Sequence, residues 1–311
     1  AGAEPVGSGI VQLRERADPA TLMGRGKVEE VAEEVARVEA EAVAVDNDLS
    51  PGQIRNLEKR LGVRVLDRSE VILDIFARRA QTRQARLQVE LAQTEYLLPR
   101  LRRMWTHLER MEGAVGTRGP GETQLETDRR MIRQKIQHHR ARLRDVARHR
   151  ATVRSGRQAM LDAALVGYTN AGKSSILRGL TGEQEIVVED RLFATLDTLT
   201  REVDLGPGLR ARVTDTVGFI RKLPHHLVAS FRATLEEAGD ADVLLHVVDA
   251  GEAGWEDQAD VVEEVLGELE LMDRPVLMVF NKSDRLDHSH ENRSARSART
   301  RTMDSLREYQ W

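Results

Sequence analysis

One octapeptide restricts the fold of this chain more than any other feature. Residues 167–174, GYTNAGKS, fit the pattern G-x-x-x-x-G-K-[ST]. The apolar run LDAALV at 161–166 precedes the pattern and predicts a buried strand, and residues 175–180 can continue as a helix. A strand, a glycine-rich loop and a helix are the context of a phosphate-binding loop, and a chance match arises in about one chain of this length in a hundred. We therefore favour an α/β nucleotide-binding domain over an ordinary strand-to-helix turn.

The residue types in this loop suit phosphate and metal binding. Gly167 and Gly172 let backbone N–H groups wrap a β-phosphate. Lys173 can neutralise β- and γ-phosphate oxygens, and the Ser174 hydroxyl can ligate Mg²⁺. The candidate nucleotide-binding residues of this loop are Gly167, Tyr168, Thr169, Asn170, Ala171, Gly172, Lys173, Ser174 and Ser175.

Two further segments supply candidate metal ligands. Residues 209–215, LRARVTD, alternate as a strand does, so Asp215 ends the strand and can hold Mg²⁺ through water, while the Gly218 N–H can meet a γ-phosphate. Thr195, in the segment FATLD, offers a second Mg²⁺ hydroxyl on a loop that can become ordered when the γ-phosphate is present, and Thr198 is its rival. The candidates in these segments are Phe193, Ala194, Thr195, Leu196, Asp197, Asp215, Thr216, Val217 and Gly218.

A guanine-selecting motif follows the apolar run PVLMVF at 275–280. The Asp284 carboxylate can accept both guanine N1–H and N2–H, whereas adenine presents an acceptor at N1. Asn281 can bridge the base and the phosphate loop, and the Lys282 stem can cover one ring face. N-K-x-D alone arises by accident in about one chain in twenty-five, but its place after a strand and the phosphate loop favours function. The candidates are Asn281, Lys282, Ser283 and Asp284.

If this domain hydrolyses the bound GTP, the sequence offers no obvious catalytic side chain for that reaction. Ras-like GTPases orient the attacking water with a Gln directly after D-x-x-G, but Phe219 stands at that position and has neither donor nor acceptor. We expect Lys173 and Thr195 to contribute transition-state stabilisation and ordering. Turnover by the isolated protein should be slow, and the catalytic residue stays unassigned.

Residues 1–68 predict a small α/β subdomain. Valines at helical spacing predict a helix over 27–38, and alternation predicts a strand over 41–46. A second helix at 51–61 and a short strand at 63–66 complete a β-α-β rhythm.

Residues 69–157 predict a long antiparallel helical hairpin. Apolar residues at helical spacing predict one helix over 69–112, kinked or broken near Pro99. The glycine-rich stretch GAVGTRGPG at 113–121 forms the tip, and a second helix follows over about 122–154. The fold class is thus α/β, with a phosphate-loop GTPase domain at 158–284 preceded by the small α/β unit and the hairpin.

Charge is segregated along the chain. Residues 51–157 carry 25 Lys and Arg against 12 Asp and Glu, whereas residues 158–284 carry 11 against 24. The basic part suggests a polyanionic partner, although a solvated, Arg-rich helix surface explains the charge equally well. The chain has no Cys, is 32% charged and lacks both a membrane-spanning apolar run and the order of a signal peptide. We expect a monomeric cytoplasmic protein, and the first residue, Ala1, suggests a fragment.

These motifs together resemble the GTPase HflX family. GYTNAGKS, FATLD, DTVGFI and NKSD are similar to its nucleotide site, and GPGETQLETDRR at 119–130 resembles a helical-hairpin motif peculiar to this family. The similarity extends from about Asp18 to Asp284. It implies GTP and GDP as ligands, Mg²⁺ as cofactor, and a large ribosomal subunit as partner, on which such proteins split or rescue stalled ribosomes with the helical arm reaching towards the peptidyl-transferase centre. The expected ribosome contacts are Gly116, Arg118, Gly119, Gly121, Arg129 and Arg130.

The end of the chain departs from this family. Residues 285–311 are polar, and no apolar strand leads into the Ser-Ala-Arg triplets at 294–296 and 297–299. We predict a disordered tail and an incomplete nucleotide domain that lacks its last strand, helix and guanine loop. A non-catalytic ribosome- or RNA-binding remnant is therefore the competing class. A coiled-coil adaptor fits the hairpin but explains neither 167–174 nor 281–284.

Overall fold

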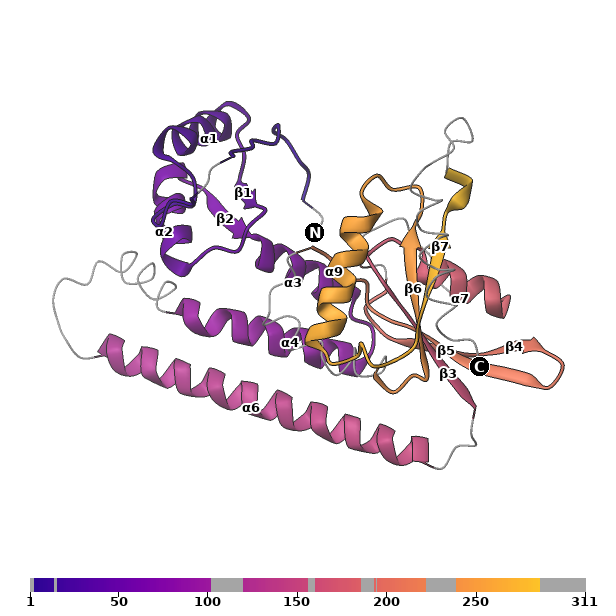
Figure 1. Cartoon of the computed structure of the whole chain (residues 1–311). Coiled ribbons are helices and arrows are strands. Elements are labelled where there is room, and N and C mark those ends of the chain that lie inside the picture. Colours follow the sequence, from indigo (N-terminus) through magenta and orange to yellow (C-terminus); the bar gives the residue numbers. More distant parts are fainter. Residues whose placement is uncertain are drawn as a thin grey trace. The chain divides into compact units, whose positions relative to one another are not determined.

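The computed structural model describes residues 3–13, 16–101, 120–155, 160–185, 193, 195–221 and 239–285, with the backbone alone at 120–125, 147 and 149–155 (Figure 1). Contacts divide the chain into two compact units, with the boundary between Ser155 and Gly156. Within the described residues, no helix is both long enough and apolar enough to span a membrane.

The first unit begins with the predicted small α/β arrangement. Its strands β1 and β2 pair in parallel, with Ala42 opposite Arg64. The Ser50 side chain accepts from the Gln53 backbone N–H and the Gln53 side chain accepts from the Ser50 N–H, which fixes the start of the second helix, and Gly62 ends that helix at φ 73°. The elements are α1 (Arg25–Arg37), β1 (Ala42–Val45), α2 (Pro51–Leu61) and β2 (Arg64–Asp67). The buried residues Val28, Val31, Ile54, Leu57 and Val65 form their core.

The single helix predicted over 69–112 is wrong in its described part. The structure has α3 (Arg68–Arg79), α4 (Arg83–Leu97) and a 3₁₀ turn η1 (Leu98–Arg100). Ala80 is extended, and the Thr82 side chain accepts from the Ala85 N–H at 3.1 Å, so a new helix is capped there. The predicted interruption near Pro99 coincides with η1, so that break is confirmed. Phe76 is 1% exposed and belongs to the interior, as expected, whereas Trp105 lies outside the described residues.

The second arm of the predicted hairpin is α6 (Pro120–Ser155), which begins within two residues of its predicted start. It runs antiparallel to α4 in the same unit (Figure 1). Buried Ile136 and Leu143 of α6 pack with Leu87 and Leu91 of α4. Gly121 lies in the first turn of α6 and not in a loop, while Gly116, Arg118 and Gly119 lie outside the described residues.

In its described residues the second unit contains a five-stranded sheet in the order β4-β5-β3-β6-β7, in which the β4–β5 pair is antiparallel and the other pairs are parallel. Its elements are β3 (Leu161–Gly167), α7 (Lys173–Thr181), β4 (Leu199–Gly206), β5 (Leu209–Asp215), β6 (Val243–Asp249), α9 (Trp255–Glu268), β7 (Val276–Asn281) and the 3₁₀ turn η2 (Ser283–Arg285). Side chains alternate across β3: Leu165 packs with Leu177 of α7, whereas Val166 packs with Val262 of α9. The two helices therefore cover opposite faces of the sheet, and the carboxyl ends of β3, β5, β6 and β7 lie at one edge.

β7 is an edge strand in the part of the sheet that the structure describes. Val276 and Leu277, which point to opposite faces at the start of the strand, are 39% and 45% exposed, in agreement with its position at the edge. Phe280 is partly shielded because its ring packs edge-on against Trp255 of α9, with ring centroids 5.3 Å apart.

Candidate functional site

The loop between β3 and α7 has the backbone geometry that a phosphate-binding loop requires. Gly167 has φ 150°, and a Cβ atom there would lie 2.3 Å from the Val247 carbonyl oxygen. Gly172 has φ 96° and forms the N-cap of α7, so the backbone N–H groups of the first turn of α7 face the loop. A Cβ atom at Gly172 would lie 2.1 Å from Nδ2 of Asn281. Glycine is therefore required at both positions by close approach as well as by dihedral angle.

Lys173 is held inside this loop. Its Nζ donates to the carbonyl oxygens of Gly167 at 3.1 Å and Tyr168 at 3.0 Å, and the residue is 6% exposed. Burial lowers the pKa of Lys173 to about 8, although the Asp215 carboxylate acts in the opposite direction. Phosphate oxygens would restore the solvation that the ammonium group has lost, so the arrangement is suited to a polyanion.

Three oxygen-bearing side chains converge beside Lys173. The Ser174 hydroxyl lies 2.7 Å from Oγ1 of Thr195 and donates to Oδ2 of Asp215 at 2.5 Å. Asp215 is 1% exposed, and burial raises its carboxyl pKa. Two hydroxyls and a carboxylate are hard oxygen donors of the kind that Mg²⁺ prefers, so these residues fit the implied ion. Thr195, and not its rival Thr198, makes this contact.

The segment after Asp215 lies against the phosphate loop. A Cβ atom at Gly218 would lie 2.8 Å from Cα of Thr169 and 3.0 Å from Nζ of Lys173, so only glycine fits there without a shift. Phe219 is 2% exposed and packs into the core beneath α9 with Val262. The side chain at the position of the Ras glutamine is thus buried in the protein interior.

The guanine motif is tied directly to the phosphate loop. Asn281 Nδ2 donates to the Ala171 carbonyl oxygen at 2.9 Å, and Lys282 Nζ donates to the Asn170 carbonyl oxygen at 2.7 Å. Lys282 is also paired at 2.8 Å with Asp249, which ends β6. Asp249 was missed from the sequence, although an acidic residue after an apolar strand was the same signal that identified Asp215. Asp284 follows in η2.

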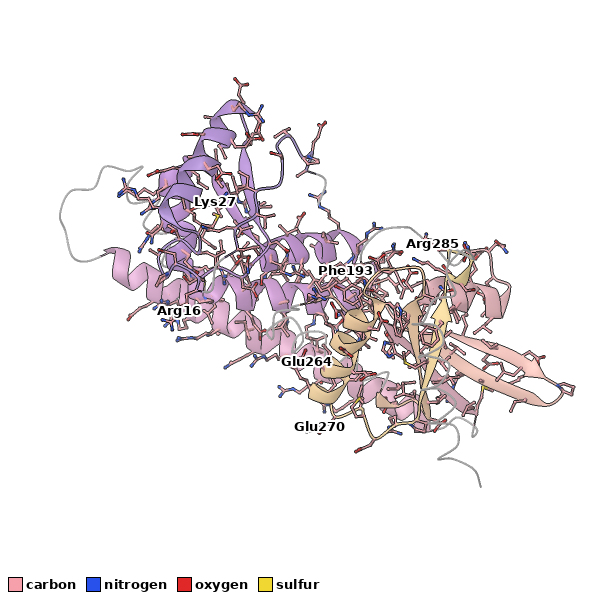
Figure 2. All side chains as sticks on the ribbon, turned by 45° about the horizontal axis from the view of Figure 1, so that its top comes forward. Arg16, Lys27, Phe193, Glu264, Glu270 and Arg285 are labelled. Atoms are coloured by element: carbon pink, nitrogen blue, oxygen red, sulfur yellow. The ribbon has the colours of Figure 1, made fainter. Side chains whose placement is uncertain are left out.

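Of the sequence-predicted residues, the structure brings the phosphate loop, Thr195, Asp215 to Gly218, and the start of the guanine motif together in one unit. Phe193, labelled in Figure 2, is 3% exposed with φ 56°, and Leu196 is 2% exposed, so these two apolar residues serve packing. Ala194 lies outside the described residues. Arg129 and Arg130 belong to α6 in the other unit.

His246 of β6 is a buried polar residue that sequence reasoning also missed. It is 1% exposed, and neither ring nitrogen has a hydrogen-bond partner among the described residues. It pairs with Val166 in the β3–β6 register, directly before the phosphate loop. Burial, assisted by the charge of Lys173, lowers the pKa of His246 to about 4.

We predict that acid destabilises the second unit through His246. The unfolded imidazole, with its ordinary pKa of about 6.5, binds more protons than the folded one between pH 6.5 and 4, so stability falls as the pH falls through that window. The expected loss between pH 7.5 and 5 is about 2 kcal/mol. Melting curves at both pH values should show that His246→Leu removes this pH dependence and that His138→Leu, at an exposed histidine, does not. Equal pH dependence in parent and His246→Leu would contradict the assignment.

Together, the glycine-bounded loop, the hydroxyl–carboxylate cluster and the tethered N-K-x-D segment define a P-loop guanine-nucleotide-binding protein. Three family models match in succession, described as GTP-binding GTPase N-terminal over residues 1–77, GTP-binding GTPase Middle Region over 79–157, and 50S ribosome-binding GTPase over 162–282. The chain belongs to the GTPase HflX family, and it is a GTPase of that family.

Curated relatives named GTPase HflX support this membership. The chain is 48% identical over 277 residues to the protein from Flavobacterium psychrophilum, covering 89% of this chain and 67% of the relative. Identity is 46% over 299 residues to the Escherichia coli protein, covering 92% and 69%. The chain thus spans about two thirds of the length of these relatives. Among solved structures, a GTP-binding protein from Sulfolobus solfataricus in complex with GDP is 21% identical, with a TM-score of 0.48 and coverage of 94% and 79%.

Proposed function

We propose that this protein binds GTP and GDP with Mg²⁺, hydrolyses GTP, and associates in the cytoplasm with the large ribosomal subunit as a monomer. The observation that carries the nucleotide part is the cluster of Ser174, Thr195 and Asp215 beside buried Lys173. A cation and a set of hard oxygen ligands, adjacent to the N-terminus of α7, match the charge distribution of a metal–triphosphate.

Each group in this site has a role in the proposed hydrolysis. Lys173 would bind β- and γ-phosphate oxygens, and the Gly218 N–H would hold the γ-phosphate from the other side. Ser174, Thr195 and Asp215 would hold Mg²⁺, Asp215 through water, and the bound ion would neutralise charge that develops on the phosphate oxygens. Water would then attack the γ-phosphorus in line with the leaving oxygen. Because the Phe219 side chain is buried and has no polar atom, the attacking water must be oriented by another group, so turnover without a partner should be slow.

The guanine preference rests on the end of β7. Asn281 and Lys282 are fixed to the phosphate loop through Ala171 and Asn170, so Asp284, two residues further on, would meet the base where the loop holds the phosphates. The carboxylate would accept two guanine donors.

The ribosomal part of the proposal rests on charge and family. The arm formed by α4 and α6 belongs to the basic part of the chain, and Arg130 is exposed on α6 while Arg129 is half-buried. Such a surface suits the phosphate groups of ribosomal RNA. The description 50S ribosome-binding GTPase, which belongs to the family model matched at 162–282, supports the same partner.

We predict that reversing Arg129 and Arg130 to Glu weakens binding to purified large ribosomal subunits by tenfold or more, and lowers the salt dependence of binding, because each lost phosphate contact removes a slope of about 0.7 to 0.9. GTP affinity should be unchanged, and GTP should outcompete ATP in parent and variant.

The parent's slow turnover should rise when large subunits are added. Sedimentation measures subunit binding and its salt dependence, and phosphate release measures GTP turnover.

The matched control reverses Lys59 and Arg60, an adjacent exposed basic pair on α2. This control should bind subunits as the parent does. Equal losses in the two double variants would mean that general charge, and not the arm, governs binding. Subunit binding without GTP turnover under any condition would favour the non-catalytic remnant.

A further inference from the structure

Backbone hydrogen bonds connect the segment that follows Asp215 to the phosphate loop. The Phe219 N–H donates to the Gly167 carbonyl oxygen at 3.0 Å, and the Thr169 N–H donates to the Phe219 carbonyl oxygen at 2.7 Å. Tyr168 and Phe219 thus form a parallel bridge outside the named strands. The bridge places one residue of the phosphate loop directly beside the residue that follows Gly218.

The Tyr168 side chain extends this contact by two residues. Its hydroxyl oxygen accepts from the Arg221 backbone N–H at 2.9 Å, and its half-buried ring packs against the core cluster that contains Phe219 and Val262. The Tyr168 phenol therefore anchors the segment at Arg221, two residues after the backbone bridge at Phe219.

This bond bears on Gly218 because Gly218 lies between the anchored ends of the segment. Asp215 ends β5 on one side, and the contacts to Phe219 and Arg221 hold the other. Gly218 is close enough to Lys173 and Thr169 that a Cβ atom would lie within 3.0 Å of both. A small displacement of the segment would move the Gly218 N–H relative to Lys173, and the N–H group is the one that can recognise a γ-phosphate.

We infer that Tyr168 is a positioning residue whose hydroxyl holds the Gly218 segment in the place where it recognises the γ-phosphate, so that it sets the preference for the triphosphate over the diphosphate. The inference deepens the proposed function and rests on it. Any guanine nucleotide gains from the loop backbone and Lys173, but only a γ-phosphate gains from a correctly placed Gly218 N–H.

The test is Tyr168→Phe, which removes one oxygen and keeps the ring. Dissociation constants for GDP and for a non-hydrolysable GTP analogue are measured with Mg²⁺ by equilibrium titration of fluorescent nucleotides. The analogue should bind two- to tenfold more weakly, which is the range expected for one neutral hydrogen bond, and GDP affinity should stay within twofold of the parent. Amide exchange should be faster at Arg221 and unchanged at Thr169.

Arg221→Ala is the matched control. It keeps the backbone N–H that donates to the Tyr168 hydroxyl and removes the side chain that forms the exposed ion pair with Asp257, at 3.0 Å. Its ratio of analogue to GDP affinity should equal that of the parent. If Tyr168→Phe weakens the binding of both nucleotides equally, Tyr168 is a structural part of the loop and the inference is wrong. Parental affinity for both nucleotides, or tighter binding of the analogue, would also overturn it. A parent protein that binds neither nucleotide would instead refute the proposed function, and this assignment with it.

Discussion

Replacing Gly172 with alanine should lower the affinity for both GTP and GDP by between about tenfold and a thousandfold. Gly172 has φ 96°, where a residue with a side chain incurs strain of about 1–3 kcal/mol. The new methyl group would lie 2.1 Å from Nδ2 of Asn281, so the Asn281 amide must move and its bond to the Ala171 carbonyl oxygen is lost, at about 0.5–1.5 kcal/mol. Both effects are relieved by moving the loop away from its phosphate-binding shape, so nucleotide affinity falls.

Gly179→Ala provides the matched control within the same helix. Gly179 is exposed in α7, and a Cβ atom there would have no heavy atom within 4 Å. This variant should keep parental nucleotide affinity and gain about 0.5–1 kcal/mol of stability, because alanine suits a helix interior better than glycine does. Isothermal titration with GDP and thermal melting separate the two outcomes. Near-parental GDP binding by Gly172→Ala would show that the loop tolerates a side chain there, contrary to this argument.

The nucleotide site was predictable because its chemistry is local in sequence. The phosphate loop needs two glycines, a lysine and a hydroxyl within eight residues, and Gly167 and Gly172 in the structure have the backbone angles that this pattern implies. The spacing of apolar residues likewise identified β3, β5 and β7, since buried parallel strands have continuous or alternating apolar runs. Thr195 was expected to offer a second Mg²⁺ hydroxyl, and only the folded geometry, in which its Oγ1 lies 2.7 Å from the Ser174 hydroxyl, distinguishes it from Thr198.

Contacts between distant segments were beyond the sequence pattern. The hydrogen bond that the Arg221 N–H donates to the Tyr168 hydroxyl, and the ion pair of Asp249 with Lys282, join residues that lie far apart in the chain and follow no spacing rule. The break between α3 and α4 was missed for a different reason. Residues 80–82 contain neither Gly nor Pro, so the sequence shows no break in the helical spacing of apolar residues. A single residue, Thr82, caps the start of α4 and separates it from α3.

A buried polar network at the end of β2 was also hidden from the sequence. Asp67 is fully buried, and its Oδ1 accepts from the Tyr96 hydroxyl at 2.8 Å and from the Glu70 N–H at 2.8 Å, which caps α3. Oδ2 accepts from Arg100 Nη2 at 3.0 Å. The Arg100 guanidinium lies 3.6 Å from the centroid of the Tyr96 ring, and burial together with the Asp67 charge raises the pKa of Tyr96 well above its ordinary value. One carboxylate thus joins β2, α3, α4 and η1.

We therefore expect Asp67→Ala to lower the free energy of unfolding of the first unit by about 3–5 kcal/mol. The substitution removes the α3 cap and leaves the Arg100 side chain, which is 13% exposed, without its carboxylate, and an unpaired charge that is largely removed from water is among the most destabilising single changes. Amide hydrogen exchange of α2 and β2 measures the effect on this unit separately from the second. Asp74→Ala is the control, because the side chains of Asp74 and its partner Arg78 are 45% and 61% exposed and such pairs contribute less than about 1 kcal/mol. If the cost arises from the unpaired Arg100, adding Arg100→Met to Asp67→Ala should restore part of the lost stability. A double variant no more stable than Asp67→Ala would assign the loss to the cap and to Tyr96 instead.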